Sequence, residues 1–273
     1  MGSKITDMCL DISFYSALPL IYGEFPDLIQ DGEFDIDPDK GVHFMALGHN
    51  RYPVIVSEKD AWHLKNFEWG IIAEYMDTPE KIKAMRRSMV NARSEKILDD
   101  KRSFWHRIRK TRCLIPVTGI YEHREIKGWK NKIPYHIRLK NRKMFCIPGL
   151  YHFNTKTPSD PETGEMRGMF TLITRAANPV MRQIHNSGDN AFRMPLFLPK
   201  EMELEWLRPD LGDAEIGKLL SYEIPADQLV YDPVYSIRGR TPRPDGLPKC
   251  APYLHADLPP LGNDDGQVQK TLF

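Results

Sequence analysis

Short apolar runs separated by loops occupy the middle of this chain, and they limit its fold more than any other feature. Between residues 113 and 151 several of these runs alternate with polar residues, which is the pattern of strands with one buried face. Similar runs occur at 42–56, 66–73 and 170–174. Because no regular strand–helix–strand alternation connects them, the pattern does not favour a parallel sheet. We therefore predict a single α+β domain whose mostly antiparallel, barrel-like β-sheet is flanked by helices.

Helical and irregular segments surround these strands. Thr78-Pro79-Glu80 has the composition of a helix start, and residues 78–110 are predicted to be largely helical. Asn178-Pro179 predicts a short helix that runs toward His185. Further predicted elements are a strand at 196–198, helices at 200–207 and 213–220, a loop at 154–168 and an extended segment at 241–268.

The bulk composition is that of an ordinary folded protein in a reducing compartment. The 273 residues are 41% apolar and 27% charged, enough for a sizeable core. The four cysteines have neither metal-ligand spacing nor the density of a disulfide framework, and the nine histidines form no ligand pattern, so we predict no metal or cofactor. Apolar runs fall short of the roughly 18 residues that span a bilayer, and the N-terminus lacks the pattern of a secretory signal. We expect a cytoplasmic, nucleoid-associated protein.

Positive charge is concentrated in one segment of a nearly neutral chain. The whole sequence has a formal net charge of +1, whereas residues 81–112 hold twelve basic and three acidic residues, a net charge of +9. Such a segment is typical of proteins that bind a polyanion such as nucleic acid. A solvated, charged helix face is the alternative interpretation.

Cys9 directly follows Met8, and this pair suggests a specific chemistry. If Met8 is the initiator and is removed, Cys9 carries a free α-amine next to its thiol. Such a 1,2-aminothiol captures an aldehyde, because the amine forms a Schiff base and the thiolate then closes a thiazolidine ring. Seven residues precede Met8 here. We therefore expect residues 1–8 to be a leader that the active protein lacks or that the chain removes by cleavage before Cys9.

Five further motifs accompany Cys9. They are Trp69-Gly70-Ile71-Ile72, Asn91-Ala92-Arg93-Ser94-Glu95, Gly119-Ile120-Tyr121-Glu122, His185 and Arg193-Met194-Pro195. Together they resemble the SRAP family, the abasic-site-processing proteins that crosslink themselves to damaged single-stranded DNA. The resemblance covers roughly residues 8–225. It implies the fold predicted above, with an SRAP domain at 9–225 and an extended C-terminal tail at 226–273.

The resemblance implies a catalytic role for each of four residues. Cys9 would be the nucleophile, and Asn91 would position the cysteine or the sugar through hydrogen bonds. Glu122 would act as the acid and base in Schiff-base formation and in reversal of the crosslink. His185 would donate a proton to the sugar oxygen as the ring opens. Together these roles make the chain an enzyme that forms a protein–DNA crosslink, with lyase-like and autopeptidase activity.

Three more residues are implied to bind DNA. Arg93 and Arg193 would contact phosphates, which an arginine can bind bidentately. An exposed Trp69 indole would stack on a base or insert at the lesion, the alternative being a core tryptophan. The chain departs from the family pattern at four places, which are Leu10-Asp11 in place of Gly-Arg, Ala73 in place of Pro, His123 in place of Trp, and seven residues, 186–192, between His185 and Arg193.

The last five residues, Gln269-Lys270-Thr271-Leu272-Phe273, resemble the pentapeptide that binds the bacterial sliding clamp. Leu272 and Phe273 would be apolar anchors in a groove, and Gln269 would bond at its rim. Such a contact would bring the protein to stalled replication forks.

Two other functions fit the same residues. A self-processing thiol peptidase would use Cys9 to release the leader, assisted by Glu122 and His185. A non-catalytic single-stranded DNA-binding module would use the basic and aromatic residues for reversible, salt-sensitive binding.

Overall fold

The computed structural model of this protein describes residues 11–14, 18–34, 42–154, 168–238 and 242–265. Cys9 and the three residues predicted to contact a sliding clamp, Gln269, Leu272 and Phe273, lie outside the described residues, so these assignments stay predictions. Within the described ranges, no helix has the length and apolar character needed to cross a bilayer.

The smaller of two sheets has five strands, all paired antiparallel. Its order is β13 (Leu229–Pro233), β9 (Ile133–Leu139), β8 (Gly119–Arg124), β1 (Asp11–Phe14) and β3 (Val42–Met45). In the first described strand, Asp11 lies opposite Tyr121 of β8 on one side and opposite Met45 of β3 on the other. The start of β1 is therefore held against the strand that carries Glu122.

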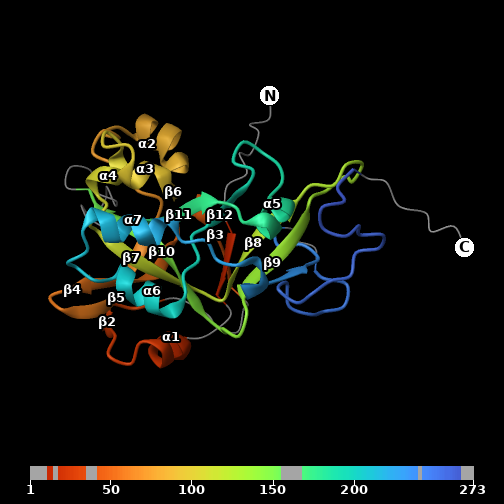
Figure 1. Cartoon of the computed structure of the whole chain (residues 1–273), viewed down its shortest axis with the longest axis horizontal. Coiled ribbons are helices and arrows are strands. Elements are labelled where there is room, and N and C mark those ends of the chain that lie inside the picture. Colours follow the sequence, from red (N-terminus) through yellow and green to blue (C-terminus); the bar gives the residue numbers. More distant parts are fainter. Residues whose placement is uncertain (1–10, 15–17, 35–41, 155–167, 239–241, 266–273) are drawn as a thin grey trace, which may run out of the picture.

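The larger sheet curls back on itself. Its order is β12 (Arg193–Pro195), β11 (Gly168–Ala176), β10 (Phe145–Phe153), β7 (Arg112–Val117), β4 (Arg51–Glu58), β5 (Ala61–Trp69) and β2 (Ile29–Asp31), with β6 (Asn91–Arg93) beside β11. β11 also pairs with β5, where Phe170 lies opposite Trp69, so the sheet is nearly closed (Figure 1). β11 is parallel to β5 and β6, β2 is parallel to β5, and the other described pairings are antiparallel. The predicted α+β class with a mostly antiparallel, barrel-like sheet is confirmed.

Short helices flank the sheets. They are α1 (Leu18–Glu24), α2 (Pro79–Met85), α3 (Glu95–Leu98), α4 (Phe104–Arg107), α5 (Pro179–Ile184), α6 (Lys200–Trp206) and α7 (Asp213–Ser221), with 3₁₀ turns η2 (Ala46–Gly48), η3 (Arg86–Met89) and η4 (Ala226–Gln228). Figure 1 shows α2, α3 and α4 grouped at one end of the molecule, and the C-terminal segment, in blue, at the other. The predicted starts of α2 and α5 are confirmed, because the side chains of Thr78 and Asn178 cap them and proline follows each.

Two predicted elements differ from the structure. The helical stretch predicted at 78–110 is interrupted by β6, because its three residues pair in parallel with β11. The strand predicted at 196–198 is wrong. The strand β12 covers residues 193–195 instead. The apolar residues after it are fully buried, and the Leu196 amide makes one further hydrogen bond to β11, at the Ile173 carbonyl. An apolar run shows burial but not which residues pair.

The folded structure continues past residue 225, where we predicted the SRAP domain to end. β13 pairs with β9 over its whole length. Farther on, Asp264 accepts a hydrogen bond from Nε of the fully buried Arg124 at 2.6 Å, and the carbonyls of Pro259 and Pro260 accept from the same guanidinium. A buried arginine needs such partners, so residues 259–264 are bound to the end of β8.

His136 is a buried titratable group in the smaller sheet. Its Nε2 lies 2.9 Å from Oγ of Ser13, and its ring stacks on Tyr121 with the centroids 4.9 Å apart. Burial lowers the pKa of His136 from 6.5 to about 3, and the charge of Arg138 acts in the same direction. Folded protein therefore holds this imidazole neutral where the unfolded chain protonates it.

We predict that His136 makes the protein less stable as the pH falls from 6.5 toward 3. The unfolded state takes up a proton in this window and the folded state does not, so the free energy of unfolding decreases by about 1.4 kcal/mol per pH unit. Urea denaturation at several pH values measures this slope. In His136→Gln the slope between pH 6 and pH 4 should be smaller by about that amount, and an equal slope in both proteins would contradict the assignment.

Candidate active site

Strand β11 brings together two segments that the sequence separates by about a hundred residues. Thr174, near its end, lies opposite Arg93 of β6 on one side and opposite Pro195 of β12 on the other. The carbonyl of Thr174 accepts hydrogen bonds from the Ser94 amide and from Nη2 of Arg193, both at 2.8 Å. Two of the predicted motifs thus meet at one residue of β11.

Arg193 is bound to a carboxylate within the protein. Its two Nη atoms lie 2.6 Å and 3.0 Å from the two carboxylate oxygens of Glu95, a bidentate pair. Burial by itself would raise the pKa of Glu95, but the hydrogen bonds and the charge of Arg193 outweigh it, so this pKa lies below its ordinary value. A phosphate contact through the two Nη atoms of Arg193 would require this pair to break. The structure gives Arg193 a role in joining β12 to α3.

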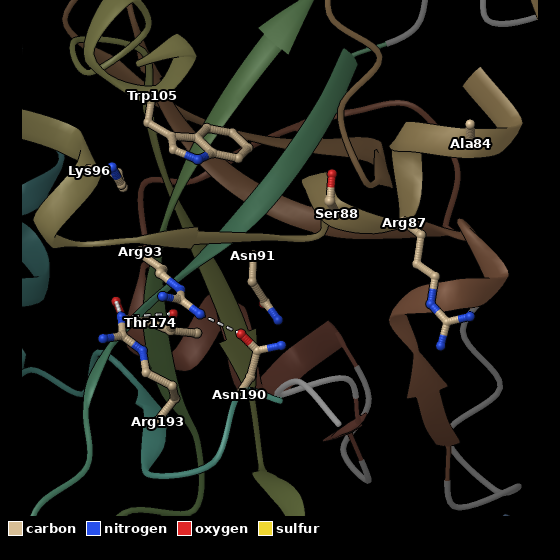
Figure 2. Close-up of a pocket in the computed structure, with 10 residues that line it drawn as sticks. All are labelled: Ala84, Arg87, Ser88, Asn91, Arg93, Lys96, Trp105, Thr174, Asn190 and Arg193. Atoms are coloured by element: carbon tan, nitrogen blue, oxygen red, sulfur yellow. Dashed lines mark hydrogen bonds between the residues drawn. The ribbon is translucent and has the colours of Figure 1, made fainter. Parts of the chain in front are cut away.

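A pocket of about 430 Å³ opens beside these strands. It is lined by Ala84, Arg87, Ser88, Asn91, Arg93, Lys96, Trp105, Thr174, Asn190 and Arg193 (Figure 2). Arg93 donates from Nη2 to the Asn190 side chain at 2.7 Å. The predicted residues Asn91, Arg93 and Arg193 therefore share one cavity.

His185 and Glu122 form a buried pair next to the backbone of Arg193. Nε2 of His185 lies 3.9 Å from Oε2 of Glu122, and both side chains are at most 3% exposed. Nδ1 lies 2.8 Å from the carbonyl of Arg193. Since a carbonyl only accepts, Nδ1 carries the hydrogen and Nε2 is left facing the carboxylate. Nε2 has no hydrogen-bond partner within the described part of the chain.

The seven residues between His185 and Arg193 do not separate the two. The segment folds back, because the Phe192 amide donates to the His185 carbonyl at 2.8 Å and the Phe192 carbonyl accepts from the Ala177 amide at 2.8 Å. Phe192 takes a left-handed conformation, with φ at 63°, where the chain turns into β12. Arg193 is therefore next to His185 despite the insertion, and Asn190 of the inserted loop reaches the pocket.

Trp69 is a core residue, and the prediction of an exposed, stacking indole is wrong. The side chain is 2% exposed and lies nearly parallel to Phe170 at a centroid distance of 5.7 Å. Its indole N–H donates to the carbonyl of Val90 at 2.9 Å. Trp69 thus fixes the backbone immediately before Asn91 and has no face free for a base.

Much of the positive charge of residues 81–112 serves the fold. Arg86 binds Glu68 at 2.7 Å, Arg109 binds Asp213 at 2.8 Å, and the buried Arg112 donates to the carbonyl of Trp206 at 2.9 Å. The basic residues of this segment that line the pocket are Arg87, Arg93 and Lys96. The net charge of the segment therefore overstates what is available to an anion.

Neither of the two buried cysteines can replace Cys9 as a nucleophile. Burial raises the pKa of the Cys113 thiol and of the Cys146 thiol, which disfavours the reactive thiolate.

A possible metal-ligand cluster lies at another sheet edge. Asp31, Glu58 and His63 have ligand atoms within 4.8 Å of one another. Nζ of Lys65 lies 2.6 Å from Glu58 and 3.5 Å from Asp31, so an ammonium group already offsets part of the negative charge of this cluster.

Sequence motifs did not indicate several residues that line the pocket, and Trp105 and Asn190 are the most distinctive of these. Trp105 belongs to α4 and Asn190 to the inserted loop, and neither lies in a motif. The basic segment around Trp105 was the signal available for it, since aromatic residues among cations are typical of nucleic-acid surfaces. For Asn190 no signal existed, because the insertion has no counterpart in the family pattern.

The geometry combines two chemical capacities. A partly enclosed basic pocket with an amide and a hydroxyl in its wall can hold an anionic, sugar-like ligand. Next to it, a buried imidazole facing a carboxylate can take up and release a proton.

Comparison with known proteins places the chain in a family. The family model described as SOS response associated peptidase (SRAP) matches residues 30–237. Similar proteins include "Abasic site processing protein YoqW" of Bacillus subtilis, 31% identical over 77% of this chain and 87% of the relative. "Abasic site processing protein YobE" of the same organism is 29% identical over 77% and 89%.

Solved structures share the fold. A crystal structure of a protein from Bacteroides thetaiotaomicron is 29% identical with a TM-score of 0.71, and the match covers 83% of this chain and 92% of that one. Another from Bordetella bronchiseptica, at 20% identity and a TM-score of 0.64, is alike in fold. Because the family model spans well over half of the sequence and a relative above 30% identity matches most of it, the chain belongs to the SRAP family.

Proposed function

We propose that this protein processes abasic sites in single-stranded DNA and that its active form begins at Cys9 and binds the lesion as a thiazolidine. The observation that carries the proposal is the buried His185–Glu122 pair next to a basic pocket lined by Asn91 and Arg93. Relatives that carry the name abasic site processing protein match most of the chain and support the substrate class.

The chain joins Cys9 to this site through a single residue. Leu10 alone lies between Cys9 and Asp11, so the Cα atoms of those two residues are at most about 7 Å apart. Asp11 pairs with Tyr121, and Glu122 is the next residue of β8. The side chain of Asp11 is itself fixed, because its Oδ1 lies 2.7 Å from Nε2 of His43 and Arg238 binds the same carboxylate. The strand that follows Cys9 in the sequence is therefore anchored beside the strand that carries Glu122.

The reaction needs a proton on the sugar oxygen before the aldehyde exists. Opening the deoxyribose ring breaks the C1′–O4′ bond, O4′ takes up a proton, and the C1′ hydroxyl loses one. Because Nδ1 of His185 already donates to a carbonyl, the ring can give a proton from Nε2 only as an imidazolium. The Glu122 carboxylate lies 3.9 Å from that nitrogen.

Bond formation then occurs at one carbon. The α-amine of Cys9 adds to C1′ and water leaves, which gives an imine, and the thiolate adds to the same carbon while the nitrogen takes up a proton. The sum is aldehyde and aminothiol going to thiazolidine and water. Glu122 can accept a proton during amine addition and return it to the departing hydroxyl. Phosphates on either side of the lesion would lie against Arg93, Lys96 and Arg87.

We predict that protein beginning at Cys9 gives a heat-stable, slower-migrating species with a single-stranded oligonucleotide that contains one abasic site. Denaturing electrophoresis and intact mass, with a gain of oligonucleotide minus water, measure it. Cys9→Ala should form none. Cys9→Ser keeps the amine, so it should form an imine that is stable only after borohydride reduction.

Protein that retains residues 1–8 provides the matched control. Its Cys9 nitrogen lies in an amide, so it should crosslink only to the extent that mass spectrometry finds the leader removed. Equal crosslinking with the leader fully retained would contradict the mechanism. Leader removal that depends on Cys9 without any DNA adduct would favour the peptidase, and reversible binding that survives Cys9→Ala without an adduct would favour the binding module.

We predict that His185→Asn and Glu122→Gln slow crosslinking by about 100-fold or more without abolishing DNA binding, since general acid–base groups contribute on this scale. Single-turnover rates with excess protein measure the effect. His63→Gln, at the distant edge between β5 and β2, is the control and should react at the wild-type rate. Loss of binding equal to the loss of rate would assign the pair a structural role.

We predict that Arg93 contributes to the salt dependence of DNA binding and that Arg193 does not. Removing one phosphate contact decreases the steepness of the negative slope of log K against log salt by about 0.7 for single strands. Arg93→Ala should show this decrease. The double change Glu95→Gln with Arg193→Gln removes an internal ion pair at constant net charge, so it should leave the slope unchanged; a decrease there would mean that Arg193 binds phosphate.

A further inference from the structure

The pocket has one aromatic residue among those that line it, Trp105. Figure 2 shows its indole projecting over the cavity, with Lys96, Arg93, Asn91 and Ser88 around it. Trp69, which the motif suggested for stacking, is buried in the core and cannot reach a base. A stacking function in this site therefore falls to Trp105.

Local packing holds Trp105 in one position. Oγ of Ser103 accepts from the Trp105 amide at 3.1 Å and caps α4. Phe104 contacts the indole edge-on, with ring centroids 5.5 Å apart. Nδ1 of His106 lies 2.9 Å from the carbonyl of Ile97, which fixes α4 against α3. A ring that is already ordered loses little conformational freedom when a ligand stacks on it.

The cations around Trp105 suit a nucleotide rather than an apolar ligand. Arg87, Arg93 and Lys96 line the same cavity. Nε and Nη2 of Arg87 are shielded from solvent and have no hydrogen-bond partner within the described part of the chain. Buried guanidinium donors of this kind favour an anionic oxygen. Figure 2 shows Arg87 across the cavity from Trp105, and a flat aromatic surface in the same cavity as such donors matches a base and a phosphate of the same strand.

We propose that Trp105 stacks on the unpaired base next to the abasic sugar and that Arg87 binds the phosphate attached to it. This inference rests on the proposed function, because it assumes DNA in this pocket. At an abasic site the neighbouring base has lost one stacking partner, so one of its faces is open. The indole of Trp105 takes the place of the missing base, which makes the pocket select the nucleotide beside the lesion.

A coupling experiment between protein and DNA tests this proposal. The probe is a single-stranded oligonucleotide with a central tetrahydrofuran, which has the shape of the abasic sugar but lacks the aldehyde and cannot crosslink. In further oligonucleotides each flanking nucleotide is replaced, one at a time, by a second tetrahydrofuran. Fluorescence anisotropy gives Kd for wild type, Trp105→Leu and the control Trp129→Ala, whose residue lines a different groove.

We predict that removing one flanking base weakens binding to the wild type about 5- to 100-fold, as expected for the loss of one base–aromatic stack. The same replacement should change binding to Trp105→Leu less than twofold, because leucine keeps apolar area but not the ring face. Trp129→Ala should retain the wild-type dependence. Trp105→Phe, which keeps a smaller ring, should show an intermediate dependence on the flanking base. This variant controls for a folding defect in Trp105→Leu.

Two outcomes would overturn the inference. One is an equal loss for wild type and Trp105→Leu at every flanking position, and the other is no binding of the oligonucleotide at all. Since the probe cannot form a thiazolidine, absence of crosslinking with true abasic DNA would refute the proposed chemistry without affecting this measurement. Normal crosslinking without base dependence at Trp105 would refute the stacking alone.

Discussion

Main-chain pairing along both edges of β11 is the constraint on which the site depends. One edge binds β6 and the other binds β12, and the carbonyl of Thr174 accepts from both neighbouring segments. These segments are far apart in sequence, so the pocket does not exist until the sheet has closed. The same pairing fixes Arg193, whose carbonyl orients the imidazole of His185. Backbone hydrogen bonds thus set the tautomer of a side chain that the proposed reaction uses, and this makes the chemistry inseparable from the fold.

Some arginines of this protein are paired inside the fold and others line the pocket, and the composition does not distinguish the two groups. Arginines such as Arg112 and Arg124 are buried and must be matched by carbonyls or carboxylates, because an unpartnered cation in the interior costs several kcal/mol. Arg193 is matched by Glu95 at the edge of the pocket itself. The anion-binding capacity left over comes from a few side chains around one aromatic ring. A nearly neutral protein can therefore have a locally basic pocket.

The sequence predicted the fold class and the caps of α2 and α5, and its motifs indicated three residues, Asn91, Arg93 and Arg193, that line one pocket. Those predictions depend on local rules of capping and alternation, or on motifs with fixed chemistry. Other features depend on tertiary pairing, which local rules do not contain. The three-residue β6 lies between helices and exists only because β11 supplies a partner. Trp69 occupies a motif position whether its indole is exposed or buried, and only packing against Phe170 decides between the two. Trp105 has no motif, and its place over the pocket follows from how α4 packs on α3.

The inserted loop changes the spacing of a motif in the sequence without changing where its residues lie in the structure. Seven residues lie between His185 and Arg193, yet the hydrogen bond from the Phe192 amide to the His185 carbonyl returns the chain to the same place. The left-handed backbone of Phe192 costs a bulky residue on the order of 1 kcal/mol or more, and the surrounding pairs hold it there. The loop also adds Asn190, which binds Arg93 and narrows the directions in which that guanidinium can point. What the proposed reaction requires here is that Arg193 lies next to His185, and an inserted loop whose two ends are joined by a hydrogen bond meets that requirement.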